Sequence, residues 1–93
     1  VSSECHLVGN LCEGNVIGIY VVGGVSHCRI EGNSLIDNDT IGLDVNGPDN
    51  LVIGNWATGN GTDYDINAGN TAGPIRTAAD IVASPHPHAN FSD

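Results

Sequence analysis

Three aspartates are the residues of this chain best placed to do chemistry. Asp44 and Asp65 occupy equivalent positions in two successive repeats of the sequence, and Asp63 lies two residues before Asp65. Neighbouring carboxylates repel each other, so one of them keeps its proton more readily or the group recruits a cation such as calcium. Two carboxyl groups are also what hydrolysis of a glycosidic bond requires. Simple solvation on an exposed acidic face is the third interpretation, and the sequence leaves all three open.

Other side chains with chemical potential are scattered. His86 and His88 lie two residues apart, and His6 and His27 precede strands of two repeats. A metal site needs three or four ligands placed together. We therefore expect no cofactor, with calcium at the aspartates as the one exception to test.

Two aromatic residues are candidate surfaces for binding a sugar. They are Trp56, which follows the Gly54-Asn55 corner, and Tyr20, which lies in the predicted strand at residues 18–21. If they face outward, their rings can stack on a glycan, whereas packing at a surface or corner is the alternative.

The equivalence of these positions comes from an internal repeat. The dipeptide Gly-Asn recurs at residues 9–10, 32–33 and 54–55, 23 and then 22 residues apart, and each time a second asparagine follows five residues after the first. A period of about 22 residues in so short a chain indicates a solenoid. The first asparagines are Asn10, Asn33 and Asn55, and the second are Asn15, Asn38 and Asn60.

Short alternating strands lie between these asparagines. Ile19, Leu43 and Tyr64 recur at one apolar position, and Val21, Val45 and Ile66 recur two residues later. Strands that stack on the next coil, about 4.8 Å away, form a parallel β-helix. We predict an all-β fold in which residues 1–75 form about three such coils and residues 76–93 form an irregular C-terminal cap of the same domain.

The asparagines have a structural role in such a fold. A corner asparagine carries amide donors and an acceptor, so asparagines at one position of successive coils can bond to each other and to the turn backbone. We expect two ladders, Asn10–Asn33–Asn55 and Asn15–Asn38–Asn60.

The second coil has one extra residue. Residues 39–41 stand against Val16 and Ile17 of the first coil. The extra residue predicts a bulge or an enlarged corner, which serves either as a binding loop or as a tolerated insertion.

The two ends of the solenoid differ in sequence. After Gly69 the repeat fades, and Ile75, Ile81, Val82 and Phe91 are expected to cover the C-terminal end. Residues 1–4 are too short to cap the first coil, so we expect either that the chain continues upstream or that a second copy covers this end.

The cysteines read as interior residues. Cys5 and Cys28 occupy equivalent positions of adjacent coils, and Cys12 aligns with Leu35 and Ala57. We expect buried thiols. A Cys5–Cys28 disulfide is the alternative, although in-register parallel strands seldom present its geometry.

Composition excludes two classes of partner. The chain has 93 residues with two basic and eleven acidic side chains, and its net charge of −9 opposes binding to nucleic acid and to anionic membranes. No apolar run approaches the roughly 20 residues that cross a bilayer, and the N-terminus lacks the pattern of a signal peptide. The compartment stays undetermined.

The paired Gly-Asn motifs, the strands at residues 18–21 and 42–45, and the passage at residues 59–66 resemble right-handed parallel β-helix proteins of the pectate-lyase-like superfamily. The resemblance covers residues 5 to about 75, and segments 68–75 and 88–91 are similar to the C-terminal end of bacterial members. It implies a right-handed coil and favours a secreted or periplasmic location, with a cytoplasmic one as the alternative.

The resemblance does not specify an activity. The superfamily includes polysaccharide lyases, glycoside hydrolases, epimerases, phage tailspikes and proteins of no assigned role. Its lyases use a basic residue, commonly with calcium, and this chain offers only Arg29 and Arg76 and no lysine. The aspartate and histidine motif of the polygalacturonase-like hydrolases is not readable here.

We therefore predict a non-catalytic structural or binding module that associates with a second copy, or forms the C-terminal part of a longer β-helix protein. The alternative is a carbohydrate-active enzyme, hydrolase-like or lyase-like, or a fragment of one. In that case Asp44, Asp63 and Asp65 are the catalytic candidates and a glycan is the partner.

Overall fold

A computed structural model describes residues 4, 6–77 and 88–92, and all regular structure in this part of the chain is β-strand. The strands are β1 (His6–Val8), β2 (Leu11–Glu13), β3 (Ile17–Val21), β4 (Arg29–Glu31), β5 (Ser34–Ile36), β6 (Ile41–Val45), β7 (Leu51–Ile53), β8 (Trp56–Thr58), β9 (Thr62–Ile66), β10 (Thr71–Ala72), β11 (Ile75–Arg76) and β12 (Asn90–Ser92).

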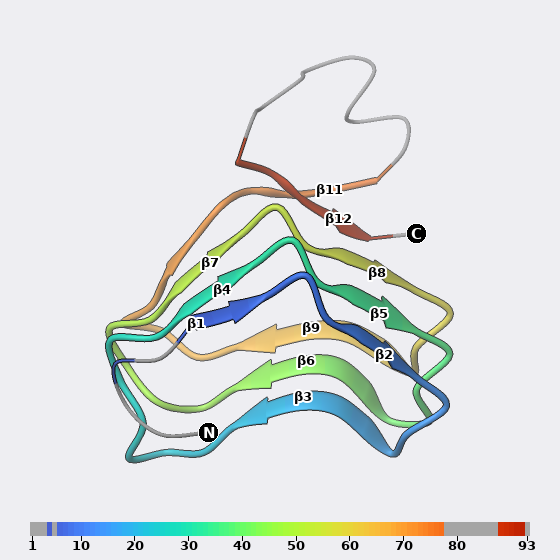
Figure 1. Ribbon diagram of the computed structural model, residues 1–93, viewed down its shortest axis with the longest axis horizontal. Helices are drawn as coiled ribbons and strands as arrows, with labels where there is room; N and C mark the ends of the chain where they lie inside the picture. The colour runs from blue at the N-terminus through green and yellow to red at the C-terminus, as the bar shows by residue number, and fades with distance from the viewer. Residues whose placement is uncertain (1–3, 5, 78–87, 93) are drawn as a thin grey trace.

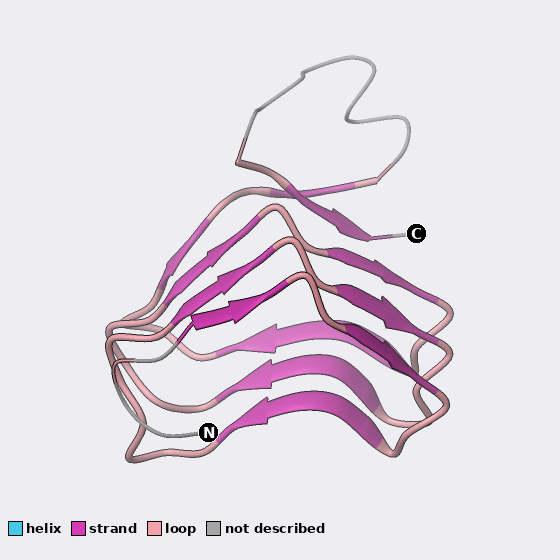
Figure 2. Cartoon of the chain, in the orientation of Figure 1, coloured by secondary structure: helices cyan, strands magenta, loops and turns pink. Residues whose placement is uncertain are grey.

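The strands form three parallel sheets that run along the stack of coils (Figures 1 and 2). Sheet A has the order β1-β4-β7-β10, sheet B has β11-β12-β8-β5-β2, and sheet C has β3-β6-β9. Within each sheet, strands of successive coils pair in parallel register, for example Leu7 with Ile30 and Ile30 with Val52. The predicted fold class is confirmed as a solenoid of about three coils with a period of about 22 residues.

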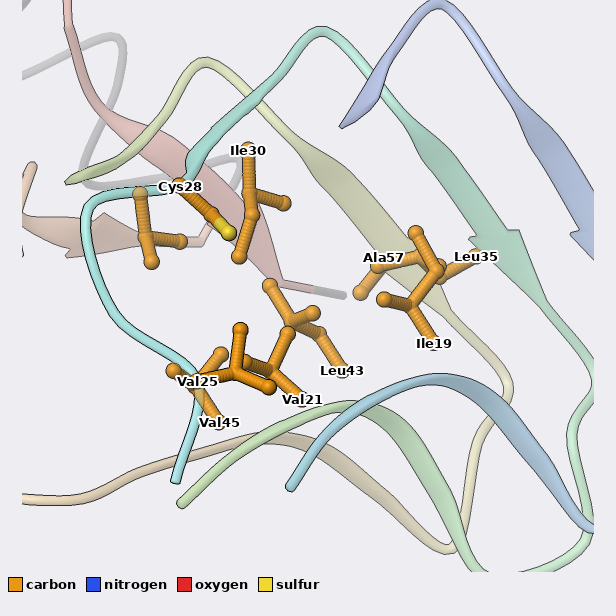
Figure 3. Packing of buried hydrophobic residues seen from close by; sticks show 10 residues of the cluster. Ile19, Val21, Val25, Cys28, Ile30, Leu35, Leu43, Val45 and Ala57 are labelled. Atoms are coloured by element: carbon orange, nitrogen blue, oxygen red, sulfur yellow. The ribbon is translucent and has the colours of Figure 1, made fainter. Parts of the chain in front are cut away.

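The core is a column of aliphatic side chains inside the coils (Figure 3). The predicted stack of Ile19 and Leu43 continues to the half-buried Tyr64, and Val21 lies in register with the fully buried Val45. Every coil adds apolar side chains at the same positions, so the buried apolar surface increases with the number of coils.

Glycine is required at the corner before each first asparagine. Gly9, Gly32 and Gly54 have φ angles of 69°, 66° and 64°. A side chain is strained in this left-handed region, whereas glycine adopts it readily. The glycine turns the chain from sheet A into sheet B, and the asparagine that follows bonds to the turn.

Asn33 shows how the first ladder works. Its Oδ1 accepts from the backbone N–H and the Nδ2 of Asn10, both at 2.9 Å. Its Nδ2 donates to the Leu7 carbonyl at 2.8 Å and to Asn55 Oδ1 at 3.0 Å. Asn38 bonds to Asn15 and Asn60 in the same way at the second corner, except that Asn15 Nδ2 turns to the Glu13 carbonyl.

The extra residue of the second coil lies in a corner. The N–H groups of Thr40 and Ile41 both donate to the Val16 carbonyl, at 2.9 and 3.4 Å. Ile41 then pairs in register with Ile17, so the strand itself is not displaced. The predicted corner enlargement is confirmed, and a binding role for it stays a prediction.

A third ladder occupies the corner before sheet A. Asn50 is 1% exposed, its Oδ1 accepts from the Cys28 N–H at 2.9 Å, and its own N–H donates to Asn70 Oδ1 at 2.9 Å. This ladder is not among the two predicted from the sequence. The recurrence of asparagine at Asn50 and Asn70 could have indicated it, but these two residues are 20 positions apart, which is shorter than the repeat of about 22 residues.

The C-terminal strands depart from simple stacking. The strand that follows β10 in the chain is β11, yet β12 lies between β11 and β8. Phe91 of β12 is half-buried, as a covering residue should be, but Ile75 is 49% exposed, so the expectation that Ile75 covers the end is wrong. Ile81 and Val82 lie outside the described residues, and the boundary after residue 75 stays a prediction.

Candidate functional site

The outer face of sheet C carries the predicted carboxylate pair. Tyr20 of β3, Asp44 of β6 and Asp65 of β9 lie in register on neighbouring strands. Tyr20 is 46% exposed, and its hydroxyl accepts from Asn46 Nδ2 at 3.2 Å. The structure thus brings two of the three candidate aspartates together beside an aromatic ring.

Asp44 lies on this outer face but is buried, so the interpretation that its carboxylate is simply solvated does not fit the structure. Asp44 is only 7% exposed, and its Oδ1 has no hydrogen-bond partner among the described residues. Its place between the strands that carry Tyr20 and Asp65 explains the difference, since both neighbours shield it from water. Desolvation, followed by repulsion from the Asp65 carboxylate, raises the pKa of Asp44 above its ordinary value.

Asp63 points elsewhere. Its Oδ1 accepts from Asn60 Nδ2 at 2.9 Å, and its Oδ2 accepts from Ser92 Oγ at 2.5 Å. In the preceding coil this position is Gly42, where an added Cβ would come within 2.8 Å of Asn60 Nδ2. Position 63 is therefore turned toward the ladder corner, and Asp63 ends the second ladder instead of completing an acidic trio.

The carboxylate pair has limited chemical capacity. Two carboxyl groups can hold a shared proton or accept hydrogen bonds from hydroxyl groups. Among the residues that the structure describes, no group of three or more histidine, cysteine, aspartate or glutamate side chains could hold a metal ion. His86 of the predicted histidine pair lies outside those residues.

A second candidate surface is the N-terminal end of the solenoid. A hollow of about 310 Å³ opens there, lined by Leu7, Cys12 and Ile19 of the core together with Asn10. These residues occupy interior positions of the first coil, in register with residues of the second coil. In the described part of the chain, nothing stacks on them from the other side.

A second hollow, the third candidate surface, lies on the outer face of sheet A. It measures about 410 Å³ and is lined by Leu51, Ile53 and Pro74, with Arg29 and His88 at its edge. Glu31 partly neutralises the positive charge of Arg29, because its carboxylate lies 3.2 Å from Arg29 Nε. Both side chains of this pair are largely solvated, so the pair contributes little to stability.

The two aromatic candidates are both 46% exposed. Trp56 lies on the outer face of sheet B, where its ring centroid is 6.4 Å from that of Phe91 with an interplanar angle of 59°. The indole therefore packs against the C-terminal strand on one side and keeps its other surface accessible.

The cysteines that the structure describes are interior residues. Cys28 is 2% exposed, and its sulfur lies 3.7 Å from the Ser26 carbonyl oxygen. Burial raises the pKa of the half-buried Cys12 thiol, which makes it less nucleophilic. The predicted alternative, a disulfide with Cys5, involves a residue outside the described part of the chain.

Comparison of the chain with protein-family models, with curated proteins and with solved structures finds no match. None of the described residues belongs to a helix of the length and hydropathy needed to cross a bilayer. The function must therefore be argued from the surfaces themselves.

Proposed function

We propose that this chain is a non-catalytic structural module that assembles through its N-terminal coil end, where a second copy stacks on the first coil. The observation that carries the proposal is the difference between the two ends. The third coil is followed by β10, β11 and β12, whereas core residues of the first coil line an open hollow.

Exposed apolar side chains support the same surface. Among the residues that the structure describes, seven large hydrophobic side chains are exposed, and five of them belong to the first coil. They are Val8, Leu11, Val16, Tyr20 and Val22. An apolar rim around an open core end is typical of an interaction surface, since single exposed hydrophobic residues are normally dispersed.

The hydrogen bonds of the first coil are also incomplete. In each later coil, the ladder asparagine accepts from the asparagine one coil earlier, as Asn33 Oδ1 does from Asn10. Asn10 is exposed, and its Oδ1 has no donor among the described residues. The edges of β1, β2 and β3 likewise offer backbone groups that another strand can pair with.

A two-fold arrangement of two copies is the simplest assembly at this end. It joins the same surface of both copies and closes on itself, whereas head-to-tail stacking would continue without limit. Membership of the pectate-lyase-like superfamily and the right hand of the coil remain part of the proposal, since they rest on the sequence resemblance.

The test is the solution mass of the chain by light scattering at several concentrations. We expect a dimer that Leu11→Lys dissociates, because Leu11 is 67% exposed at the rim and a lysine at a strand edge opposes pairing. Ile75→Lys is the matched control, because Ile75 is 49% exposed beyond the third coil. A monomer at all concentrations, or equal loss in both variants, would refute the proposal.

A glycan-binding role at Tyr20, Asp44 and Asp65 is the second candidate. The unpartnered Oδ1 of Asp44 beside an exposed ring favours it, because sugars combine an apolar face with hydroxyl donors. Titration with a neutral oligosaccharide, followed by the nuclear magnetic resonance signals of the Tyr20 ring, tests this role. Loss of binding in Tyr20→Ala is expected, and no binding at millimolar concentration would exclude it.

A further inference from the structure

The strand β12 occupies a position that a later coil would normally fill. In sheet B it pairs with β8 through Phe91 and Trp56, and with β11 through Phe91 and Arg76. It therefore lies between two strands that are already in place along the chain, as Figure 1 shows. We call this position the β8/β11 slot.

Each described residue of β12 makes a specific contact in the slot. Asn90 is completely buried and continues the first ladder: its Oδ1 accepts from Asn55 N and Nδ2 at 3.1 and 2.9 Å. Its Nδ2 donates to the carbonyls of Val52 and Gly73, both at 3.0 Å. The slot thus has a place for one asparagine side chain and saturates its hydrogen bonds.

The next two residues are recognised by other side chains. Phe91 packs against Trp56, and its carbonyl oxygen lies 2.7 Å from the Tyr64 hydroxyl. Burial raises the pKa of Tyr64, so this hydroxyl keeps the proton that it donates. Ser92 Oγ donates to Asp63 Oδ2. The slot consequently selects an extended segment of the type asparagine, aromatic residue, serine.

We propose that the β8/β11 slot is a strand-binding site, and that its partner is the β12 strand of a second copy of this chain. A copy of β12 from another molecule presents the same three side chains and satisfies the same groups. The strand is three residues long, and a short element with few contacts opens at a lower free energy than the whole fold. Opening of β12 exposes the slot and frees a strand for the neighbour.

The site is distinct from the N-terminal coil end. The coil-end interface uses the edges of β1, β2 and β3, whereas the slot uses β8 and β11 at the other side of the stack. The variant Leu11→Lys should abolish association at the coil end and leave the slot unchanged.

The experiment measures binding of a fluorescent synthetic peptide with the sequence of residues 88–93 to the intact chain in the Leu11→Lys background, by anisotropy. The resident strand competes, so the apparent affinity is reduced by the fraction of molecules in which the slot is open. We expect Phe91→Ala in the chain to weaken the resident strand and to increase peptide affinity at least threefold. Ser92→Ala, which removes only the bond to Asp63, serves as a second and milder variant if Phe91→Ala does not fold.

The matched control is a peptide in which the asparagine equivalent to Asn90 is replaced by alanine. It leaves the ladder groups of Asn55 unpaired, and we expect at least a tenfold loss of affinity. Equal binding of both peptides would overturn the proposal. So would absence of peptide binding in both folded variants. In the same background, where the coil-end dimer is absent, native mass spectrometry of mixed heavy and light chains should show a minor mixed dimer formed by exchange of the strand, and its absence would overturn the choice of partner.

Discussion

At the residue scale, the outcome at each polar position depends on which neighbours the coils place around it. Asp44 and Asp65 share one outer row, yet Asp44 is 7% exposed while Asp65 at the edge of the sheet is solvated. Asn33 and Asn15 are both ladder asparagines, but Asn33 lies between two coils, whereas Asn15 has a neighbouring coil on one side. The contribution of each polar side chain to stability therefore depends on its position in the stack and not on its residue type.

The pH dependence of stability is a direct test of Asp44. Because its pKa is raised in the folded state, the folded chain binds more protons than the unfolded chain in the interval between the two pKa values. Stability from this group is therefore present below the unfolded pKa of about 3.9 and is lost as the pH rises through the folded pKa. We expect Asp44→Asn to be more stable than the wild type at pH 7 and no more stable at pH 3.

Urea denaturation at a series of pH values measures this difference. Asp39→Asn, at an exposed corner residue, is the matched control for the replacement of an aspartate by asparagine. An Asp44→Asn curve parallel to the wild type throughout would contradict the assigned desolvation.

Replacement of Asn33 by alanine tests the ladder. Its side chain is 1% exposed and bonds to groups of both neighbouring coils. We expect a loss of about 1–3 kcal/mol in the free energy of unfolding, since the groups left behind are buried and unpaired. Asn15→Ala, at an exposed end of the second ladder, should cost less than about 1 kcal/mol by the same measurement. Equal effects would show that the ladder contributes no more than a surface asparagine.

At the scale of the element, glycine positions define where coils approach each other. A Cβ at Gly42 would come within 2.8 Å of Asn60 Nδ2 and of the Asp63 carbonyl oxygen, and one at Gly24 would meet nothing within 4 Å. We expect Gly42→Ala to destabilise the fold by about 1–3 kcal/mol through overpacking. Gly24→Ala should be neutral or stabilising by up to about 1 kcal/mol, because it restricts the unfolded chain. Thermal unfolding of both variants gives the comparison, and a neutral Gly42→Ala would contradict the close approach.

The sequence predicts the regular part of these elements well, because stacked rungs repeat their side chains at a constant spacing. The inward rows of sheet C and the extra corner residue follow from alignment of the coils alone. The place of Asn90 in the first ladder could not be predicted from the repeat. Its strand, β12, follows β11 in the chain but lies between β11 and β8 in the sheet. The sequence wrongly grouped Asp63 with Asp44 and Asp65. Asp63 is equivalent to Gly42, and side chains at this position point toward the ladder corner instead of the outer face of sheet C.

At the scale of the whole molecule, the two ends of the described solenoid differ: the third coil is followed by further strands, whereas β1, β2 and β3 have a described neighbour on one side only. Coils gain stability from their neighbours, so a terminal coil with only one neighbour is the weakest part of such an array. Within the described part of the chain, the first coil has this position and also carries five of the seven exposed large hydrophobic side chains. Association at that end would supply the missing neighbour and stabilise the fold by mass action.

The most direct test of this account is backbone amide hydrogen exchange at low and high protein concentration. In a parallel strand, alternate amides point to each neighbour, so part of the amides of β1, β2 and β3 point away from the second coil. We predict that these amides become protected as the concentration rises, while β10 and β11 do not change. Exchange in the first coil that is independent of concentration, or protection that rises first at the C-terminal strands, would contradict the account.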